Sequence, residues 1–136
     1  MNLPDPAEVS QMPVQTLAYI GDAVYELFVR QLVLSKHRAK PGRLHSLSIQ
    51  YAKAVYQAAA ALRILDLLTE TEKNILLRGR NADPGTIAKN ASPQEYRWAS
   101  GLESLLGYLH LSGEHERLEE LLLLIVEEGK DHASGQ

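Results

Sequence analysis

The chain contains no cysteine. This absence excludes disulfide bonds, thiolate metal sites and cysteine nucleophiles. The sequence also has no glycine-rich phosphate loop, no His-Glu-x-x-His pair and no dinucleotide-binding fingerprint. Its N-terminus has neither the basic segment nor the apolar core of a signal peptide, and its longest apolar run, 121–126, is too short to span a bilayer. We therefore expect a soluble, cytoplasmic protein.

The composition is that of one ordinary globular domain. The chain has 136 residues, of which 45% are hydrophobic and 23% are charged, which is enough to bury a single core. The histidines share no spacing typical of metal ligands, so we expect surface or interface positions for His37, His45, His110, His115 and His132.

The charges are unevenly distributed along the chain. The net charge of −3 by itself does not favour a nucleic-acid partner. Residues 30–97, however, contain 12 Lys and Arg against 5 Asp and Glu, whereas residues 98–136 contain 2 against 8. A basic middle segment of this kind is typical of a surface that binds a polyanion. The alternative is that these side chains only cover solvated helix faces.

The hydrophobic pattern predicts an all-α domain. No alternating run of strand type occurs, and apolar residues recur at three- and four-residue steps in every long segment. We expect helices at about residues 13–37, 44–68, 69–77, 92–111 and 114–128. In this prediction residues 1–12 are an N-terminal extension, 13–130 form the domain, and 131–136 are a flexible tail.

Two helix starts have strong local signals. Thr69 is followed three residues later by Glu72, and Ser92 by Pro93 and then Glu95, which are the spacings of capping boxes. Between these two segments lies a basic, glycine-containing stretch, 78–90. It shows no clear periodicity, so we expect a functional loop there.

Two carboxylates lie within apolar helical segments, where a charged side chain is unfavourable. Asp22 lies within an apolar helical segment, directly after Gly21, and Glu103 is the only charged residue between Arg97 and Glu114. Two carboxylates from packed helices can hold a hard divalent cation, which polarises a phosphodiester and activates water. The alternative is that both acids form structural ion pairs. Glu26, one turn after Asp22, is either a supporting ligand or a partner for Arg30.

The segments around these acids resemble a known family. Residues 17–24 (LAYIGDAV) resemble the signature helix of the ribonuclease III endonuclease domain, and residues 102–109 (LESLLGYL) resemble its second catalytic helix. Residues 40–45 (KPGRLH), 78–82 (RGRNA) and 89–91 (KNA) are similar to the short form, Mini-ribonuclease III, which lacks a double-stranded-RNA-binding domain. The resemblance extends over about residues 14–128.

This resemblance implies a helical endonuclease that acts as a two-fold homodimer. It further implies Mg²⁺, or Mn²⁺ in its place, and hydrolysis of double-stranded RNA to 5′-phosphate and 3′-hydroxyl ends. The implied substrate is precursor 23S ribosomal RNA, with a ribosomal protein as a candidate helper. By position, Asp22 and Glu103 fall on the metal-binding, catalytic acids of the family. Tyr19 and Ile20 are expected at the dimer interface, with ordinary core as the alternative.

The chain also departs from the larger members of the family. Where those have glutamates it has Gln15 and Ala18, and where they have an aspartate it has Ser100. With Glu26, we expect Gln15 and Ser100 to support the metal site through its water ligands. Phosphate contacts supply affinity for duplex RNA without reading its sequence. We expect these contacts from Arg78, Arg80, Lys89, Lys40, Arg43 and Arg97.

Two other functions remain as alternatives to the nuclease. The first is a catalytically silent relative that binds double-stranded RNA in RNA processing or ribosome assembly, which the departures at Gln15, Ala18 and Ser100 favour. The second is a helical protein–protein module without an RNA partner. Salt-sensitive binding to duplex RNA distinguishes this module from the other two functions.

Overall fold

The predicted all-α fold is confirmed. The computed structural model describes residues 1–2, 4–83 and 92–134, with side chains as far as residue 126, and no strand occurs in this part of the chain. Its elements are α1 (Pro6–Val9), α2 (Val14–Lys36), α3 (Pro41–Ala52), α4 (Ala54–Ile64), the 3-10 turn η1 (Leu65–Leu67), α5 (Glu70–Asn81), α6 (Pro93–Leu111) and α7 (His115–Ser134). None of the helices described is both long and apolar enough to cross a membrane.

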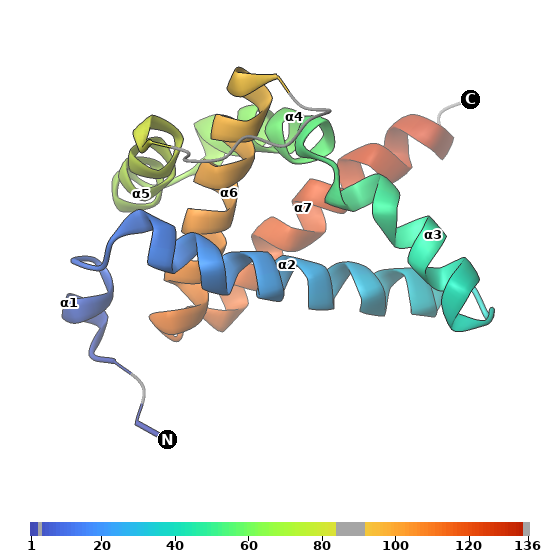
Figure 1. Ribbon diagram of the computed structural model, residues 1–136, viewed down its shortest axis with the longest axis horizontal. Coiled ribbons are helices and arrows are strands. Elements are labelled where there is room, and N and C mark those ends of the chain that lie inside the picture. Colours follow the sequence, from blue (N-terminus) through green and yellow to red (C-terminus); the bar gives the residue numbers. More distant parts are fainter. Residues whose placement is uncertain (3, 84–91, 135–136) are drawn as a thin grey trace.

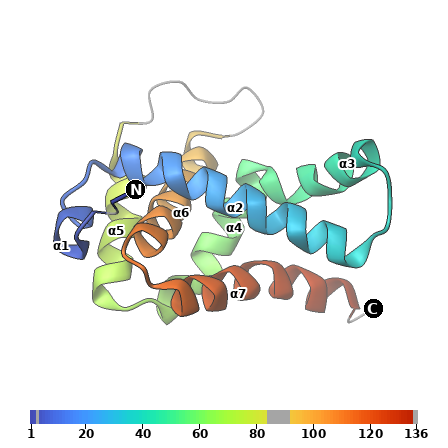
Figure 2. The same cartoon turned by 90° about the horizontal axis from the view of Figure 1, so that it is seen from below.

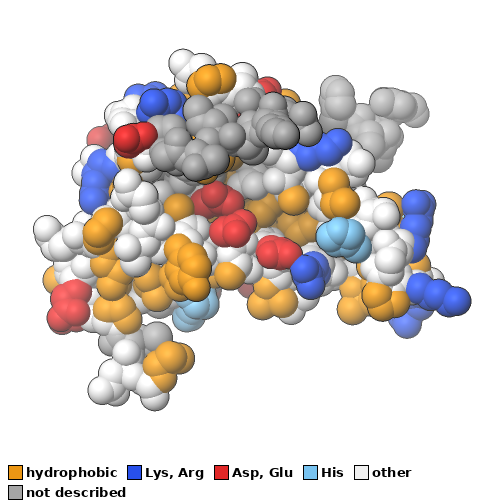
Figure 3. All heavy atoms as spheres, viewed as in Figure 1, with side chains coloured by type: hydrophobic (Ala, Val, Ile, Leu, Met, Phe, Trp, Pro, Cys, Tyr) orange, Lys and Arg blue, Asp and Glu red, His pale blue; other side chains and the backbone are white. Residues whose placement is uncertain are grey.

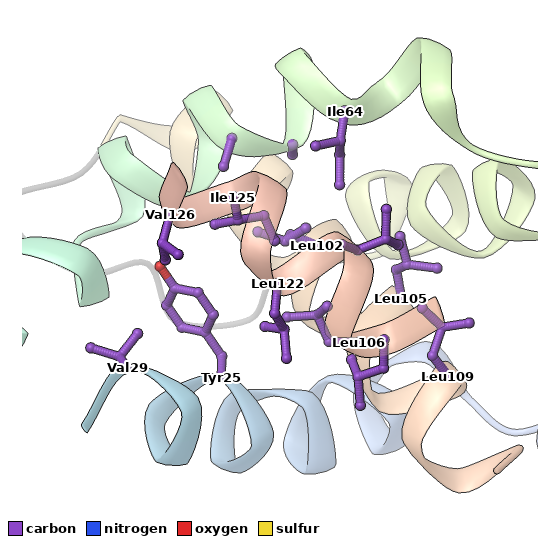
Figure 4. Packing of buried hydrophobic residues seen from close by; sticks show 14 of the residues in the cluster. Tyr25, Val29, Ile64, Leu102, Leu105, Leu106, Leu109, Leu122, Ile125 and Val126 are labelled. Carbon is purple, nitrogen blue, oxygen red and sulfur yellow. The ribbon is translucent and has the colours of Figure 1, made fainter. Parts of the chain in front are cut away.

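Helix α6 is the centre of the molecule. Helices α2, α4, α5 and α7 all pack against it, and α2 crosses it along one side (Figures 1 and 2). Four leucines of α6 are buried, at positions 102, 105, 106 and 109, and they meet Tyr25 of α2, Ile64 of α4 and Ile125 of α7 (Figure 4). Because α6 is apolar on several sides, the other helices can bury their single apolar stripes against it.

Both predicted capping boxes are confirmed. The hydroxyl of Thr69 accepts from the backbone N–H of Glu72, whose carboxylate accepts from the N–H of Thr69. Ser92 and Glu95 form the same reciprocal pair at the start of α6. Each box satisfies two backbone donors that the first helical turn leaves without partners.

The prediction of one helix over 44–68 is wrong. Helix α3 ends at Ala52, Lys53 is extended (ψ 141°), and α4 and η1 follow. The break is stabilised by side chains that bind backbone carbonyls at the end of α3. The hydroxyl of Tyr25 donates to Tyr51 O (2.7 Å), and Gln57 Nε2 donates to Ala52 O (3.1 Å). The first of these bonds comes from a distant helix, so no local signal predicts it.

The predicted loop at 78–90 is wrong over its first four residues, which belong to α5. Gly79 is buried in the contact with α6, where an added Cβ would lie 2.5 Å from Ser104 Oγ and 2.9 Å from Gly101 Cα. This glycine therefore permits close helix packing and does not end the helix. Residues 84–91, which include Lys89, lie outside the described residues.

The N-terminal extension packs on the domain. Val9 of α1 is fully buried beside Leu17 of α2 and Ile75 of α5. The guanidinium of Arg78 donates to the carbonyls of Ser10 (3.2 Å) and Met12 (3.4 Å). These contacts fix the chain just before α2 and thereby the start of the helix that carries Asp22.

Candidate active site

The crossing of α2 and α6 depends on a pair of glycines. A Cβ built on Gly21 would overlap the backbone carbonyl of Glu103, and one built on Gly107 would overlap the carbonyl of Leu17. The two backbones are therefore in direct contact, which only glycine allows at these positions. Asp22 follows Gly21 directly, so this contact places its side chain beside that of Glu103.

The carboxyl groups of Asp22 and Glu103 interact directly. Asp22 is exposed, whereas Glu103 is partly buried between the helices. Burial raises the pKa of Glu103 from 4.5 to about 8, and a hydrogen bond with Asp22 and the charge of Asp22 act in the same direction. In the free protein at neutral pH, Glu103 is therefore mainly protonated.

A polar pocket of about 330 Å³ opens at this pair. Its walls come from α2, α6 and the end of α5. They include Gln15, Ala18, Tyr19, Asp22, Arg97, Ser100 and Glu103. In the face shown in Figure 3, acidic side chains gather near the middle of the molecule with apolar side chains around them. The pocket therefore joins both acids to solvent.

The donor set of this pocket suits a hard cation that keeps several water ligands. No group of three His, Cys, Asp or Glu able to hold a metal occurs among the described residues. Asp83 also lines the pocket, but Asp22 and Glu103 are the two acids that interact directly and would be the charged ligands. The amide of Gln15 and the hydroxyl of Ser100 line the same pocket and offer neutral oxygen atoms. Two carboxylates with water-filled positions are what Mg²⁺ accepts.

Glu26 lies outside this pocket. It is exposed and pairs with Arg30 one turn further along α2, at 2.5 Å. It lines a second pocket, which shares Asp22 with the first. Three residues were expected to support the metal site. Gln15 and Ser100 line the pocket with the two acids, whereas Glu26 lies in the neighbouring pocket.

Three of the arginines expected to bind RNA have internal partners. Arg78 donates to the N-terminal segment, as described above. Arg80 lies over the ring of Trp98 at 4.8 Å and donates to Asn81 Oδ1. Arg97 donates to the carbonyls of Arg80 (3.5 Å) and Ala82 (3.2 Å) at the end of α5. These guanidinium groups stabilise the helix contacts around the pocket.

The remaining predicted residues lie on exposed parts of two helices. Lys40 and Arg43, at the start of α3, are exposed and have no ion-pair or hydrogen-bond partner for their side chains within the described ranges. Tyr19 is 78% exposed, and Ile20 is half-buried. Tyr19 is therefore not a core residue, and its exposed aromatic ring beside the two acids is available for contact with a partner.

Sequence reasoning missed two residues near the site. Ser104 is buried and donates to Val14 O (3.1 Å) and Ser100 O (2.9 Å), which ties the start of α2 to α6. Gln57 is 5% exposed and lines the second pocket. Its signal was available, because it is the only polar side chain apart from Tyr56 in the apolar run 54–62.

The raised pKa of Glu103 predicts a fall in stability with rising pH. In the folded state the carboxyl group of Glu103 stays protonated up to about pH 8, whereas in the unfolded chain it does so only up to about pH 4.5. The stability that this protonation contributes is therefore present in full below pH 4.5 and is lost as the pH rises through 8. We expect the melting temperature of the metal-free protein to fall between pH 5 and 8 and then to level off.

Glu103→Gln is the control for this melting series, because glutamine does not titrate. The pKa of Glu72 is lowered, chiefly by its hydrogen bond from Arg117. Its contribution to stability is therefore lost as the pH falls into the acid range, which is the opposite direction to that of Glu103. The difference between the two proteins therefore isolates Glu103. Equal pH dependence of wild type and Glu103→Gln would contradict the assignment.

Two carboxylates from crossing helices that meet at a polar pocket can hold a divalent ion, and metal-assisted phosphodiester hydrolases use such an ion. Residues 15–114 match the family model of the ribonuclease III domain. The chain belongs to this family.

Named relatives and a solved structure agree with this membership. The chain is 43% identical to Mini-ribonuclease 3 of Clostridium tetani, over 93% of this chain and 90% of that protein. It is 47% identical to Mini-ribonuclease 3 of Thermoanaerobacter sp., over 82% and 78%. The crystal structure of protein FN1578 from Fusobacterium nucleatum has a TM-score of 0.75 at 26% identity, over 83% of this chain and 90% of that one.

The family defines the enzyme class. The chain is an endoribonuclease, and the family acts on double-stranded RNA, generally with a divalent metal ion, and typically as a dimer.

Proposed function

We propose that Asp22 and Glu103 are the catalytic acids, that they hold Mg²⁺, and that the substrate is a duplex within precursor 23S ribosomal RNA. The observation that carries this proposal is the direct interaction of the two carboxyl groups in the wall of a polar pocket. The relatives called Mini-ribonuclease 3 support the choice of substrate class. A ribosomal protein that presents the RNA belongs to the same proposal.

The chemistry divides between the ion and the chain. When bound, the ion would polarise the scissile phosphate and lower the pKa of a water molecule. The exposed carboxylate of Asp22 reaches toward solvent, while the partly buried Glu103 fixes the inner side of the site. Gln15 and Ser100 have the hydrogen-bonding groups needed to orient water in the pocket.

The RNA backbone meets basic side chains near this pocket and at the start of α3. Lys40 and Arg43 are the first contacts in our proposal, because their charges have no internal partner in the described structure. Arg78, Arg80 and Arg97 contribute positive potential beside the pocket while their donors hold helices together. Contacts of this kind bind phosphates without reading bases.

The proposed dimer forms through the exposed side of α2. Tyr19 and Leu27 are 78% and 59% exposed, which gives this helix an apolar face outside the core. A second copy that covers Tyr19 and Ile20 would place two pockets near each other, one for each RNA strand.

The proposal is tested with two duplexes of equal length, one from precursor 23S ribosomal RNA and one of unrelated sequence. We expect cleavage only with a divalent ion, 5′-phosphate ends, faster cutting of the ribosomal duplex, and a steep loss of binding with added salt. Equal rates on both duplexes would contradict the ribosomal assignment, and cleavage in excess chelator would contradict the metal.

A further inference from the structure

A second pocket lies on the other side of Asp22, between α2 and α3. Its volume is about 200 Å³, and its walls include Asp22, Glu26, His45, Ser48, Ile49 and Gln57. Helices α2 and α3 contact each other, and α3 runs back from the end of α2 at an angle to it (Figure 1). Because Asp22 lines both pockets, the second pocket adjoins the candidate metal site.

Gln57 leaves a buried acceptor without a partner. The residue is 5% exposed, and its Nε2 donates to Ala52 O. Its Oε1 is closed off from solvent and accepts no hydrogen bond from any described residue. A buried amide oxygen without a donor costs free energy, and such groups in native proteins commonly have a specific role.

The other polar groups of the pocket do not satisfy this acceptor. The hydroxyl of Tyr25 donates to Tyr51 O, and that of Ser48 donates to Leu44 O (2.9 Å). Glu26 is paired with Arg30 at the rim. His45 and Arg30 also line the pocket, but neither donates to Gln57 Oε1, which remains without a partner. The complement of this oxygen is a ligand that brings a hydrogen-bond donor.

Helix α3 is suited to admit such a ligand. None of its residues is fully buried, and it contacts chiefly α2 and α4, with Leu44, Leu47 and Tyr51 partly buried against the core. A helix without a fully buried residue can move by a small amount at a lower cost than the helices of the core. This movement would open the space between α2 and α3 down to Gln57.

We propose that the second pocket receives the ribose of a nucleotide beside the scissile phosphate, and that Gln57 Oε1 accepts a hydrogen bond from its 2′-hydroxyl. This inference rests on the proposed function, because it assumes that the scissile phosphate lies at the divalent ion beside Asp22. The 2′-hydroxyl is the donor that distinguishes RNA from DNA at a given site. Gln57 would then be a specificity-determining residue that favours an RNA strand over a DNA strand.

The test combines one substitution in the protein with one in the RNA. Single 2′-deoxy nucleotides are placed in turn around the cleavage site of a short duplex, and both kcat/KM and the dissociation constant are measured for wild type and Gln57→Met. In wild type we expect a loss of about threefold to tenfold at one position next to the scissile phosphate, the size of one hydrogen bond. In Gln57→Met the same deoxy substitution should cause no further loss.

Controls separate this result from a loosened helix junction. Gln50→Met makes the same chemical change at an exposed position of α3 and should retain the full deoxy penalty. If Gln57→Met lowers the melting temperature strongly, Ile49→Trp at the pocket rim replaces it, and we expect at least about fivefold weaker kcat/KM with the wild-type melting temperature.

Three outcomes would overturn the inference. These are the absence of any sensitive position in wild type, an equal deoxy penalty in wild type and Gln57→Met, and unchanged kcat/KM in Ile49→Trp. A penalty that depends instead on the divalent ion concentration would assign the pocket to a cation. Deoxy sensitivity in binding without any cleavage would count against the proposed function alone, whereas cleavage without this coupling would count against the pocket alone.

Discussion

Asp22→Asn and Glu103→Gln should each lower cleavage of duplex RNA by at least about a thousandfold, more than the 10- to 100-fold typical of losing an outer partner of a metal ligand. The reason is that these are the two carboxylates that interact with each other at the pocket, so each variant removes one of the two charged groups placed together for a cation. The measurement is the single-turnover rate at saturating RNA in Mg²⁺. The double variant should be little worse than either single one, because the two groups act as a unit.

Matched controls distinguish lost chemistry from lost structure. Asp66→Asn and Glu116→Gln make the same changes at exposed positions away from the pocket and should cut RNA at the wild-type rate. Asp22→Asn should also melt at a higher temperature than wild type at pH 8, because it removes a charge that repels the ionised Glu103. Full cleavage by both site variants would refute the assignment, and RNA binding without cleavage by the wild type would favour the silent relative.

The sequence predicts those features of the fold that have local causes. The capping boxes at Thr69 and Ser92 are closed by residues three positions apart, so their side chains are sufficient to start a helix. The apolar stripes of α2, α6 and α7 likewise follow from spacing alone. Such signals depend on no other part of the chain.

The break at Lys53 and the continuation of α5 through residues 78–81 both have tertiary causes. No proline or glycine marks the break at Lys53, which is stabilised by Tyr25 from another helix. Gly79 and the arginines around it have the composition of a loop, but α6 provides the surface on which this glycine packs. The pattern of one segment cannot show what its neighbour contributes.

The two acids of the candidate site could be predicted from the sequence, but the contacts of the basic residues around them could not. Asp22 and Glu103 are conspicuous because carboxylates are rare in apolar helices, and the structure brings them together. The roles of Arg78 and Arg97 were not accessible, because their acceptors are backbone carbonyls from other segments. A basic side chain gives the same signal in sequence whether it binds a phosphate or ends a helix.

Gly21→Ala and Gly107→Ala should each destabilise the protein by about 3 kcal/mol or more, at the upper end of what overpacking costs. In each case the new methyl group would overlap a backbone carbonyl, that of Glu103 or that of Leu17. Backbone cannot rotate away as a side chain can, so α2 and α6 would have to separate. For a chain of this length the melting temperature should fall by about 10 °C.

Gly42→Ala is the matched control, because an added Cβ there meets nothing within 4 Å. It lies in the first turn of α3 and should be neutral or slightly stabilising, since alanine reduces the entropy of the unfolded chain. Any Gly21→Ala protein that remains folded should also lose cleavage, because separation of the helices moves Asp22 away from Glu103. Wild-type stability and activity in Gly21→Ala would show that the backbone contact between α2 and α6 does not position the two acids.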